Sequence, residues 1–155
     1  MFTIAVSPCS NPEMTLDEAL AAYAELGYRR FEMFTGWAKS AANPLDAPQP
    51  YVDLAARHGF AYCCIHLPAL SDDLEASVGE AARAARFGAD IGCRCAIVKA
   101  RTKQDFFAGT RRLIRQAGHE LRLDQRDVGG GHVDGEAGPA VLKRDSGHGE
   151  ASDGV

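Results

Sequence analysis

The stretch GFAYCCIHLP, residues 59–68, carries the pattern that decides the fold. Its apolar and aromatic run predicts a buried strand over residues 60–67. A glycine in front of such a run is typical of the end of a helix, and Pro68 ends the strand. A helix therefore leads directly into this strand, and His66 stands near the strand's carboxyl end.

The same order of helix, glycine and strand recurs through residues 1–118. Strands are predicted, about 30 residues apart as in βα units, at residues 2–7, 30–34, 60–67 and 95–99. The first helix begins at a capping box of Thr15 and Glu18 and ends before Gly27. This alternation predicts an α/β fold of parallel strands joined by right-handed crossovers. Four such units form either half of a (β/α)8 barrel or a small open sheet, and the residues fit both.

Residues 119–155 differ in composition from the rest of the chain. Basic and acidic residues balance in residues 1–118, so the formal charge of -4 falls on residues 119–155, which also hold half of the 16 glycines and no aromatic residue. Such a segment buries too little apolar area to offset its ordering entropy. Its Gly, Arg, Asp, His and Ala bias is what an out-of-frame reading of GC-rich DNA gives. We therefore predict a folded domain over residues 1–118 and an irregular tail, disordered or frameshifted, over residues 119–155. In the tail, residues 140–142 form only a short apolar run and no convincing fifth strand.

Charge and hydropathy exclude several classes of protein. A net charge of -4 and a pI near 5.7 disfavour a nucleic-acid partner. No run reaches the ~18 apolar residues of a membrane span, and the N-terminal MFTIAVSPCS lacks the basic region of a signal peptide. We therefore expect no membrane partner and a cytoplasmic protein. The glycine-rich motifs that bind dinucleotides or nucleoside triphosphates are also absent.

The five cysteines are an odd number without the spacing of a disulfide framework or a zinc motif. Free thiols in a reducing compartment are expected, and a zinc site is the alternative. Because side chains alternate along a strand, Cys63 and Cys64 are expected on opposite faces of the sheet.

Polar side chains stand near the carboxyl ends of the predicted strands, where parallel α/β folds place their active sites. Glu32 and His66 lie near the ends of two strands, Lys99 ends the fourth, and Trp37 lies in a loop. A carboxylate, an imidazole and an ammonium suit the polar groups of a small molecule, and an indole suits the apolar face of a sugar. Each also has a structural alternative, namely an ion pair, a hydrogen-bonded strand end, a solvated lysine and loop packing. Further polar positions at these ends are Ser7, Cys9, Ser10, Asn11, Thr35 and Arg101.

Residues 4–40 and 56–68 carry a resemblance to a known family. A helix ending in ELGYRRFE leads to a strand that closes on Glu32, and the next strand closes on His66 followed by Leu67-Pro68. Over about residues 2–117, the chain resembles the xylose isomerase-like TIM-barrel superfamily of sugar phosphate isomerases and epimerases. The resemblance implies the first four βα units of a (β/α)8 TIM barrel, a half barrel, over residues 1–118.

The resemblance also implies an activity, in which a proton moves between adjacent carbons of a sugar with the help of a divalent metal (Mn, Mg, Co or Zn). In that family the acid/base residues and main metal ligands come mostly from the second half of the barrel, and a complete barrel takes about 250 residues. We therefore expect no catalytic residue and no bound metal in this chain, because Glu32 and His66 supply only two ligands. The residues expected to bind substrate are Glu32, Trp37, His66 and Lys99.

Three functions from different classes follow. The chain is a truncated sugar (phosphate) isomerase or epimerase that is inactive alone, a non-catalytic sugar-binding module, or a non-functional gene fragment. A nuclease of the endonuclease IV type, which shares the fold, is disfavoured because Lys99 stands where such enzymes have a fourth-strand histidine. The expected partner is a sugar or sugar phosphate. A second copy could close the barrel as a homodimer, since the first and fourth strands would otherwise have unpaired edges.

Overall fold

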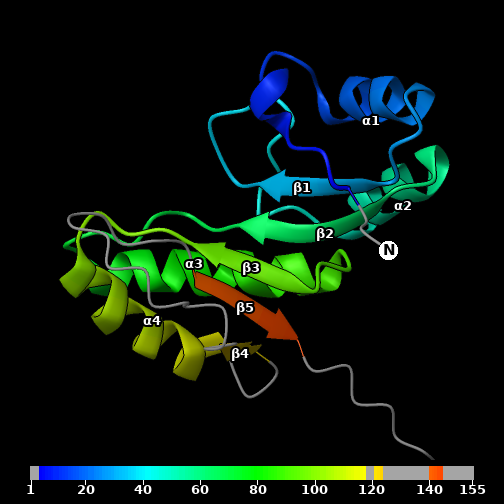
Figure 1. The fold of residues 1–155 in the computed structure, drawn as a ribbon. Helices are drawn as coiled ribbons and strands as arrows, with labels where there is room; N and C mark the ends of the chain where they lie inside the picture. The colour runs from blue at the N-terminus through cyan, green and yellow to red at the C-terminus, as the bar shows by residue number, and fades with distance from the viewer. Residues whose placement is uncertain (1–3, 118–120, 124–139, 145–155) are drawn as a thin grey trace, which may run out of the picture.

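Helices and strands alternate along the chain in the computed structural model, which describes residues 4–117, 121–123 and 140–144 (Figure 1). No helix within these ranges is long and apolar enough to cross a membrane. The elements in chain order are a 3₁₀ turn η1 (Pro8–Ser10), α1 (Leu16–Glu25), β1 (Arg30–Phe34), α2 (Gln49–His58), β2 (Ala61–His66), α3 (Leu74–Asp90), β3 (Cys95–Val98), α4 (Lys103–Ala117), β4 (Leu121–Leu123) and β5 (Ala140–Arg144).

Three of the strands run parallel to one another. β1 pairs with β2 and β2 pairs with β3, and the helices α2 and α3 carry the chain from each strand to the next. This is the βα arrangement that the sequence predicts, in which each helix crosses over to start a neighbouring parallel strand. The predicted α/β fold class is confirmed, and these strands and helices match half of a TIM-barrel-like fold.

The strand predicted over residues 2–7 is reduced to a single bridge at Val6. The Val6 N–H donates to the Arg30 carbonyl at 2.9 Å, and the Val6 carbonyl accepts from the Glu32 N–H at 2.9 Å. Directly afterwards, the Ser7 hydroxyl accepts from the Cys9 N–H, and Pro8 starts the turn η1. The prediction of a longer strand is therefore wrong within the described part, because Ser7, the residue after Val6, already caps the turn that starts at Pro8. Residues 1–3 lie outside the described residues.

Two short strands from the predicted tail join the sheet, whose order is β1-β2-β3-β5-β4. β5 runs antiparallel to β3, and β4 runs antiparallel to β5. The prediction of an irregular tail without a fifth strand is wrong for these two segments, because the free edge of β3 offers backbone hydrogen bonds that a short apolar run can satisfy. For residues 118–120, 124–139 and 145–155, the tail prediction lies outside the described residues.

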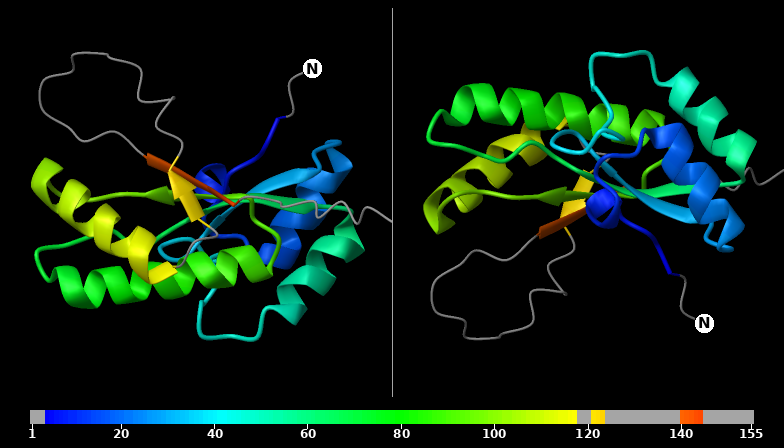
Figure 2. Two further views of the ribbon diagram at one scale, coloured as in Figure 1. Left: turned by 90° about the horizontal axis from the view of Figure 1, so that it is seen from below. Right: turned by 90° about the horizontal axis from the view of Figure 1, so that it is seen from above.

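The helices α1 to α4 all cover the same face of the sheet, as Figure 2 shows from two sides. Leu20 of α1, Val78 of α3 and Leu113 of α4 are buried in one core with the strand side chains that face them. Those strand side chains are Phe31, Met33, Tyr62, Ile65, Ala96 and Val98. The opposite face of β1 and β2 is left for polar and reactive side chains.

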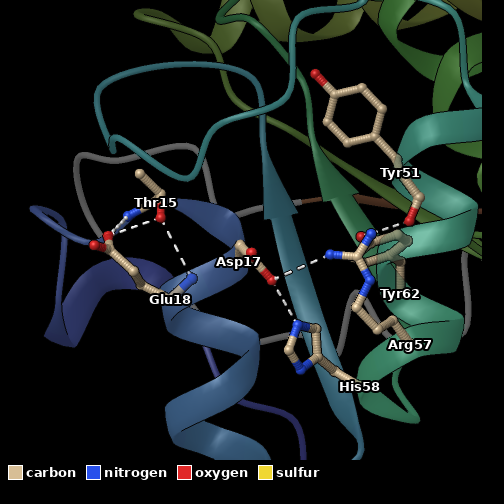
Figure 3. Close-up of polar contacts among 7 residues, drawn as sticks. All are labelled: Thr15, Asp17, Glu18, Tyr51, Arg57, His58 and Tyr62. Carbon is tan, nitrogen blue, oxygen red and sulfur yellow. Dashed lines mark hydrogen bonds and ion pairs between the residues drawn. The ribbon is translucent and has the colours of Figure 1, made fainter.

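Surface contacts join α1 to α2 (Figure 3). The Asp17 carboxylate lies 2.6 Å from His58 Nε2 and 3.9 Å from a guanidinium nitrogen of Arg57. The Tyr62 hydroxyl donates to the Tyr51 carbonyl at 3.0 Å and so ties β2 to α2. Exposed ion pairs contribute at most about 1 kcal/mol to stability. These contacts therefore orient α1 and α2, while the packing of the apolar core supplies most of the stability.

The capping box predicted for α1 is present in its first turn (Figure 3). The Thr15 hydroxyl accepts from the Glu18 N–H at 3.3 Å, and the Glu18 carboxylate accepts from the hydroxyl and the N–H of Thr15, both at 2.7 Å. These hydrogen bonds, the hydroxyl first, lower the pKa of Glu18 below its ordinary value.

Replacing Glu18 with glutamine should therefore lower the thermal unfolding midpoint at neutral pH and leave it nearly unchanged in acid. A carboxyl group whose pKa is lower in the folded chain than in the unfolded chain stabilises the folded chain. This stabilisation is complete above the ordinary glutamate pKa of about 4.3 and is lost as the pH falls through the folded-state pKa. Circular dichroism melts at neutral and acid pH measure the difference. Glu25→Gln, at the exposed end of the same helix, is the control. An equal drop in the unfolding midpoint at both pH values would contradict a stabilising role for the ionised Glu18 carboxylate.

Candidate functional site at the ends of strands β1 and β2

An irregularity in the pairing of β1 with β2 determines which side chains lie together on the open face, the face of these strands that the helices do not cover. Phe31 pairs with Tyr62, but the next pair is Glu32 with Cys64, so Cys63 has no partner in β1. An extra residue of this kind is a β-bulge, and it shifts the side-chain alternation of one strand against its neighbour. The bulge brings Cys64 directly opposite Glu32.

The bulge also explains the burial pattern of β2. Tyr62 and Ile65 both pack into the helical core although they are three positions apart, a spacing that a regular strand does not allow. Cys64 and His66 are two positions apart and lie on the open face with Glu32. The thiols of Cys63 and Cys64 lie close enough for each to shift the pKa of the other, so the prediction that they point to opposite faces is wrong.

Glu32 and His66, the two residues singled out from the sequence, meet at the carboxyl ends of their strands. His66 Nε2 lies 3.4 Å from Glu32 Oε2, and their side chains are 14% and 31% exposed. The Glu32 side chain is therefore partly open to a small molecule, whereas both ring nitrogens of His66 are buried behind it. The two atoms are close but lack hydrogen-bond geometry, and neither ring nitrogen of His66 has a hydrogen-bond partner within the described ranges.

The imidazole of His66 is fixed by its surroundings. Its ring stacks on the ring of Phe34, with centroids 3.8 Å apart and planes 13° from parallel. The Thr35 hydroxyl donates to the His66 carbonyl at 2.9 Å, which joins the ends of β1 and β2. Burial lowers the pKa of His66, the Glu32 carboxylate opposes this, and the ammonium of Lys99 adds to it. Burial prevails, so the ring is neutral near pH 7 and offers a free lone pair.

Cys64 completes the cluster, and the sequence did not predict it. One ligand atom each from Glu32, Cys64 and His66 lie within 4.8 Å of one another. Hydrogen bonds with the thiols of Cys63 and Cys95, together with burial, raise the pKa of Cys64, whereas the hydrogen bond with Cys64 lowers the pKa of Cys63 to about 7. The spacing of three between Tyr62 and Ile65 is the sequence signal that could have revealed the bulge.

Lys99 and Trp37 frame this cluster through Phe34. Lys99 is exposed, and its Nζ lies 5.7 Å from the centroid of the Phe34 ring. Trp37 is 63% exposed and meets the Phe34 ring edge to face at 5.6 Å. His66, Lys99 and Trp37 therefore lie around the Phe34 ring at the strand ends, and Glu32 joins them through its contact with His66.

The backbone at Trp37 is strained. Its φ of 58° lies in the left-handed region, and the Ala38 N–H donates to the Gly36 carbonyl at 2.9 Å, which closes a three-residue turn around the indole. A non-glycine residue in this conformation costs about 1–3 kcal/mol, and such strain is concentrated at binding and active sites. An exposed indole held in this way is suited to cover a ligand.

Two of the other polar positions at the first strand end have structural partners. The Ser7 hydroxyl caps η1, and the Asn11 side-chain oxygen accepts from the Tyr23 hydroxyl at 2.9 Å. A separate hollow of about 380 Å³ lies between α3 and α4, lined by Leu74, Glu75, Val78, Arg112, Arg115 and Gln116. It lies within the helical layer and not at the strand ends.

Comparisons with known proteins identify the fold and no closer relationship. No protein-family model matches the chain, and no curated protein does. Among solved structures, a xylose isomerase domain-containing protein from Salmonella typhimurium LT2 matches with a TM-score of 0.51 and 13% sequence identity. The match covers 61% of this chain and 36% of that protein. The chain therefore has a xylose isomerase-like fold. It spans little more than a third of the length of the solved protein.

Proposed function

We propose that the chain binds a sugar or sugar phosphate at the ends of β1, β2 and β3, as the first half of an isomerase- or epimerase-type site. The observation that carries the proposal is the pairing of Glu32 with His66 at 3.4 Å, at the strand ends where this fold class places its ligands. The xylose isomerase-like fold supports it.

Each binding residue has a role that its surroundings allow. The Glu32 carboxylate accepts hydrogen bonds from sugar hydroxyls. The neutral imidazole of His66 takes part in binding only once the ligand displaces Glu32 from its 3.4 Å contact with the buried Nε2. Lys99, exposed beside Phe34, attracts a phosphate or carboxylate group. Trp37 covers the apolar face of the sugar ring. A divalent metal, as the resembled family uses, would polarise the sugar carbonyl.

A fluorescence titration tests this proposal, because Trp37 is the single tryptophan of the chain. Adding aldoses or aldose phosphates should change its emission with saturation. Glu32→Gln should weaken the affinity about 10- to 100-fold, as expected for a lost hydrogen bond to a charged group. Glu25→Gln, on the far end of α1, should leave the affinity unchanged. No saturable change with any sugar would contradict the proposal.

Lys99→Met separates the two ligand classes. It should weaken the binding of sugar phosphates and leave neutral sugars unaffected, whereas Lys103→Met, at the start of α4, should change neither. An equal loss for both ligands would show that Lys99 supports the fold of the site and does not read a phosphate.

A non-catalytic binding module is the second candidate, favoured because the exposed indole of Trp37, held in a strained turn beside Phe34, suits ligand binding without chemistry. Exchange of deuterium from solvent into the carbon next to the sugar carbonyl separates the two, since it needs proton abstraction. A cytoplasmic location belongs to this proposal. A homodimer stays a prediction, and the edge of β3 that it would use is occupied by β5.

A further inference from the structure

We propose that Glu32, Cys64 and His66 form a binding site for a thiophilic divalent cation of the zinc class. A carboxylate oxygen, a thiol sulfur and an imidazole nitrogen from these residues lie within 4.8 Å of one another. They come from two adjacent strands, so the site is built on the sheet and not on a mobile loop.

The backbone itself places the three ligands. Glu32 and Cys64 are register partners across β1 and β2, directly after the bulge. His66 follows Cys64 by two residues on the same strand, so both side chains project from the same face. Strand-borne ligands keep their positions better than loop-borne ones, which favours a preformed site.

The His66 side chain is held in place but lacks partners of its own. Its ring is fixed by stacking on Phe34 at 3.8 Å, while Nδ1 and Nε2 are both buried without a hydrogen bond in the described part of the chain, and Nε2 faces only Glu32 Oε2 at 3.4 Å. Buried polar atoms nearly always have a partner, and an exception calls for an explanation such as an ion. A cation bound between Glu32 and His66 would supply the partner of Nε2, the ring nitrogen that faces the carboxylate.

The mixture of donor atoms selects the metal. Oxygen-only sites suit Mg²⁺, Ca²⁺ and Mn²⁺, whereas sulfur and imidazole nitrogen favour Zn²⁺. With usual zinc–ligand bonds of about 2.0–2.3 Å, tetrahedral ligand atoms lie roughly 3.3–3.8 Å apart. The ligand atoms of the present group lie up to 4.8 Å apart, so they must move closer together by about 1 Å when zinc binds. Three protein ligands leave a fourth position for water or another small ligand.

This site differs from the metal site that the family resemblance implies, whose ligands come mostly from the second half of the barrel. The expectation of no bound metal rested on two ligands, and Cys64 is the third. Zinc binding by these residues does not require a sugar, so it can be measured without one. A failure of sugar binding and a failure of metal binding are therefore separate results.

Zinc stoichiometry and affinity test the inference. The whole chain is stripped with a chelator, kept reduced with a phosphine, and titrated with Zn²⁺ in a calorimeter. We expect one zinc per chain, with Cys64→Ser and Glu32→Gln each weakening the affinity by at least about 10- to 100-fold. Co²⁺ in place of Zn²⁺ should give a thiolate-to-metal charge-transfer band that Cys64→Ser abolishes.

Cys63→Ser is the matched control, because this neighbouring thiol donates to the Phe31 carbonyl at 3.4 Å and is not one of the three ligands. It should retain one zinc and the Co²⁺ band. Circular dichroism verifies that each variant is folded, and Glu32→Gln, on a half-exposed side chain, is expected to keep the fold. Absence of zinc binding, or equal binding by Cys64→Ser and the unaltered chain, would overturn the proposal. Loss of binding in Cys63→Ser but not in Cys64→Ser would do the same.

Discussion

Replacing Phe31 with alanine should lower the free energy of unfolding by about 3–5 kcal/mol. The side chain is 0% exposed, and its ring lies 6.3 Å from that of Tyr23 and 6.5 Å from that of Tyr62. The Phe31 side chain therefore fills the space between α1 and the sheet, and Phe31 is the direct neighbour of Glu32 in β1. Removing it leaves a cavity that the flanking aromatic rings can only partly close.

Denaturant unfolding followed by circular dichroism measures this loss. Phe107→Ala is the control, because Phe107 is 56% exposed on α4 and substitutions at such positions change stability by about 0.5 kcal/mol or less. Similar losses in the two variants would show that Phe31 does not hold β1 against the helical layer.

Replacing Gly88 with alanine should destabilise the chain by about 1–3 kcal/mol, as overpacking does. A Cβ at this position would lie 2.5 Å from Ile65 Cγ2 and 3.2 Å from Ile65 Cβ. These atoms sit close to the backbone of β2, so they cannot swing away as the end of a long side chain can. Either α3 or β2 must move.

Gly79→Ala, in the same helix, provides the matched control with an opposite sign. Nothing lies within 4 Å of a Cβ at Gly79, so alanine should stabilise the helix by up to about 1 kcal/mol. Thermal melts of the two variants compare them directly. If both substitutions stabilise the chain, the close approach of α3 to β2 is not present in solution.

Because Ile65 lies between Cys64 and His66, Gly88→Ala should also weaken zinc binding.

Local signals in the sequence were sufficient to predict most of the repeated unit. The capping box at Thr15 and Glu18 is present, and Gly27 and Gly59 adopt the positive φ that ends a helix. These signals act within a few residues of the chain, so no tertiary information is needed to recognise them. The meeting of Glu32 with His66 was also predictable, because neighbouring parallel strands bring their carboxyl ends to one edge of the sheet.

Features that depend on the partner strand were not predictable. Alternation along β2 placed Cys63 and Cys64 on opposite faces, but the register against β1 contains a bulge and brings Cys64 to Glu32. The antiparallel pairing of β5 with β3 joins residues more than forty positions apart, and a short apolar run alone does not indicate it. Register is set by packing between strands, so no single segment contains it.

The sequence by itself determined where α1 to α4 and β1 to β3 lie, and that a carboxylate and an imidazole stand at the strand ends, because capping, glycine and hydropathy act locally. Only the tertiary structure decided that a thiol joins them, that Phe34 holds the imidazole in place, and that the edge of β3 is covered. Those outcomes depend on how one strand is aligned against the next, which requires the whole sheet and the helices packed on it.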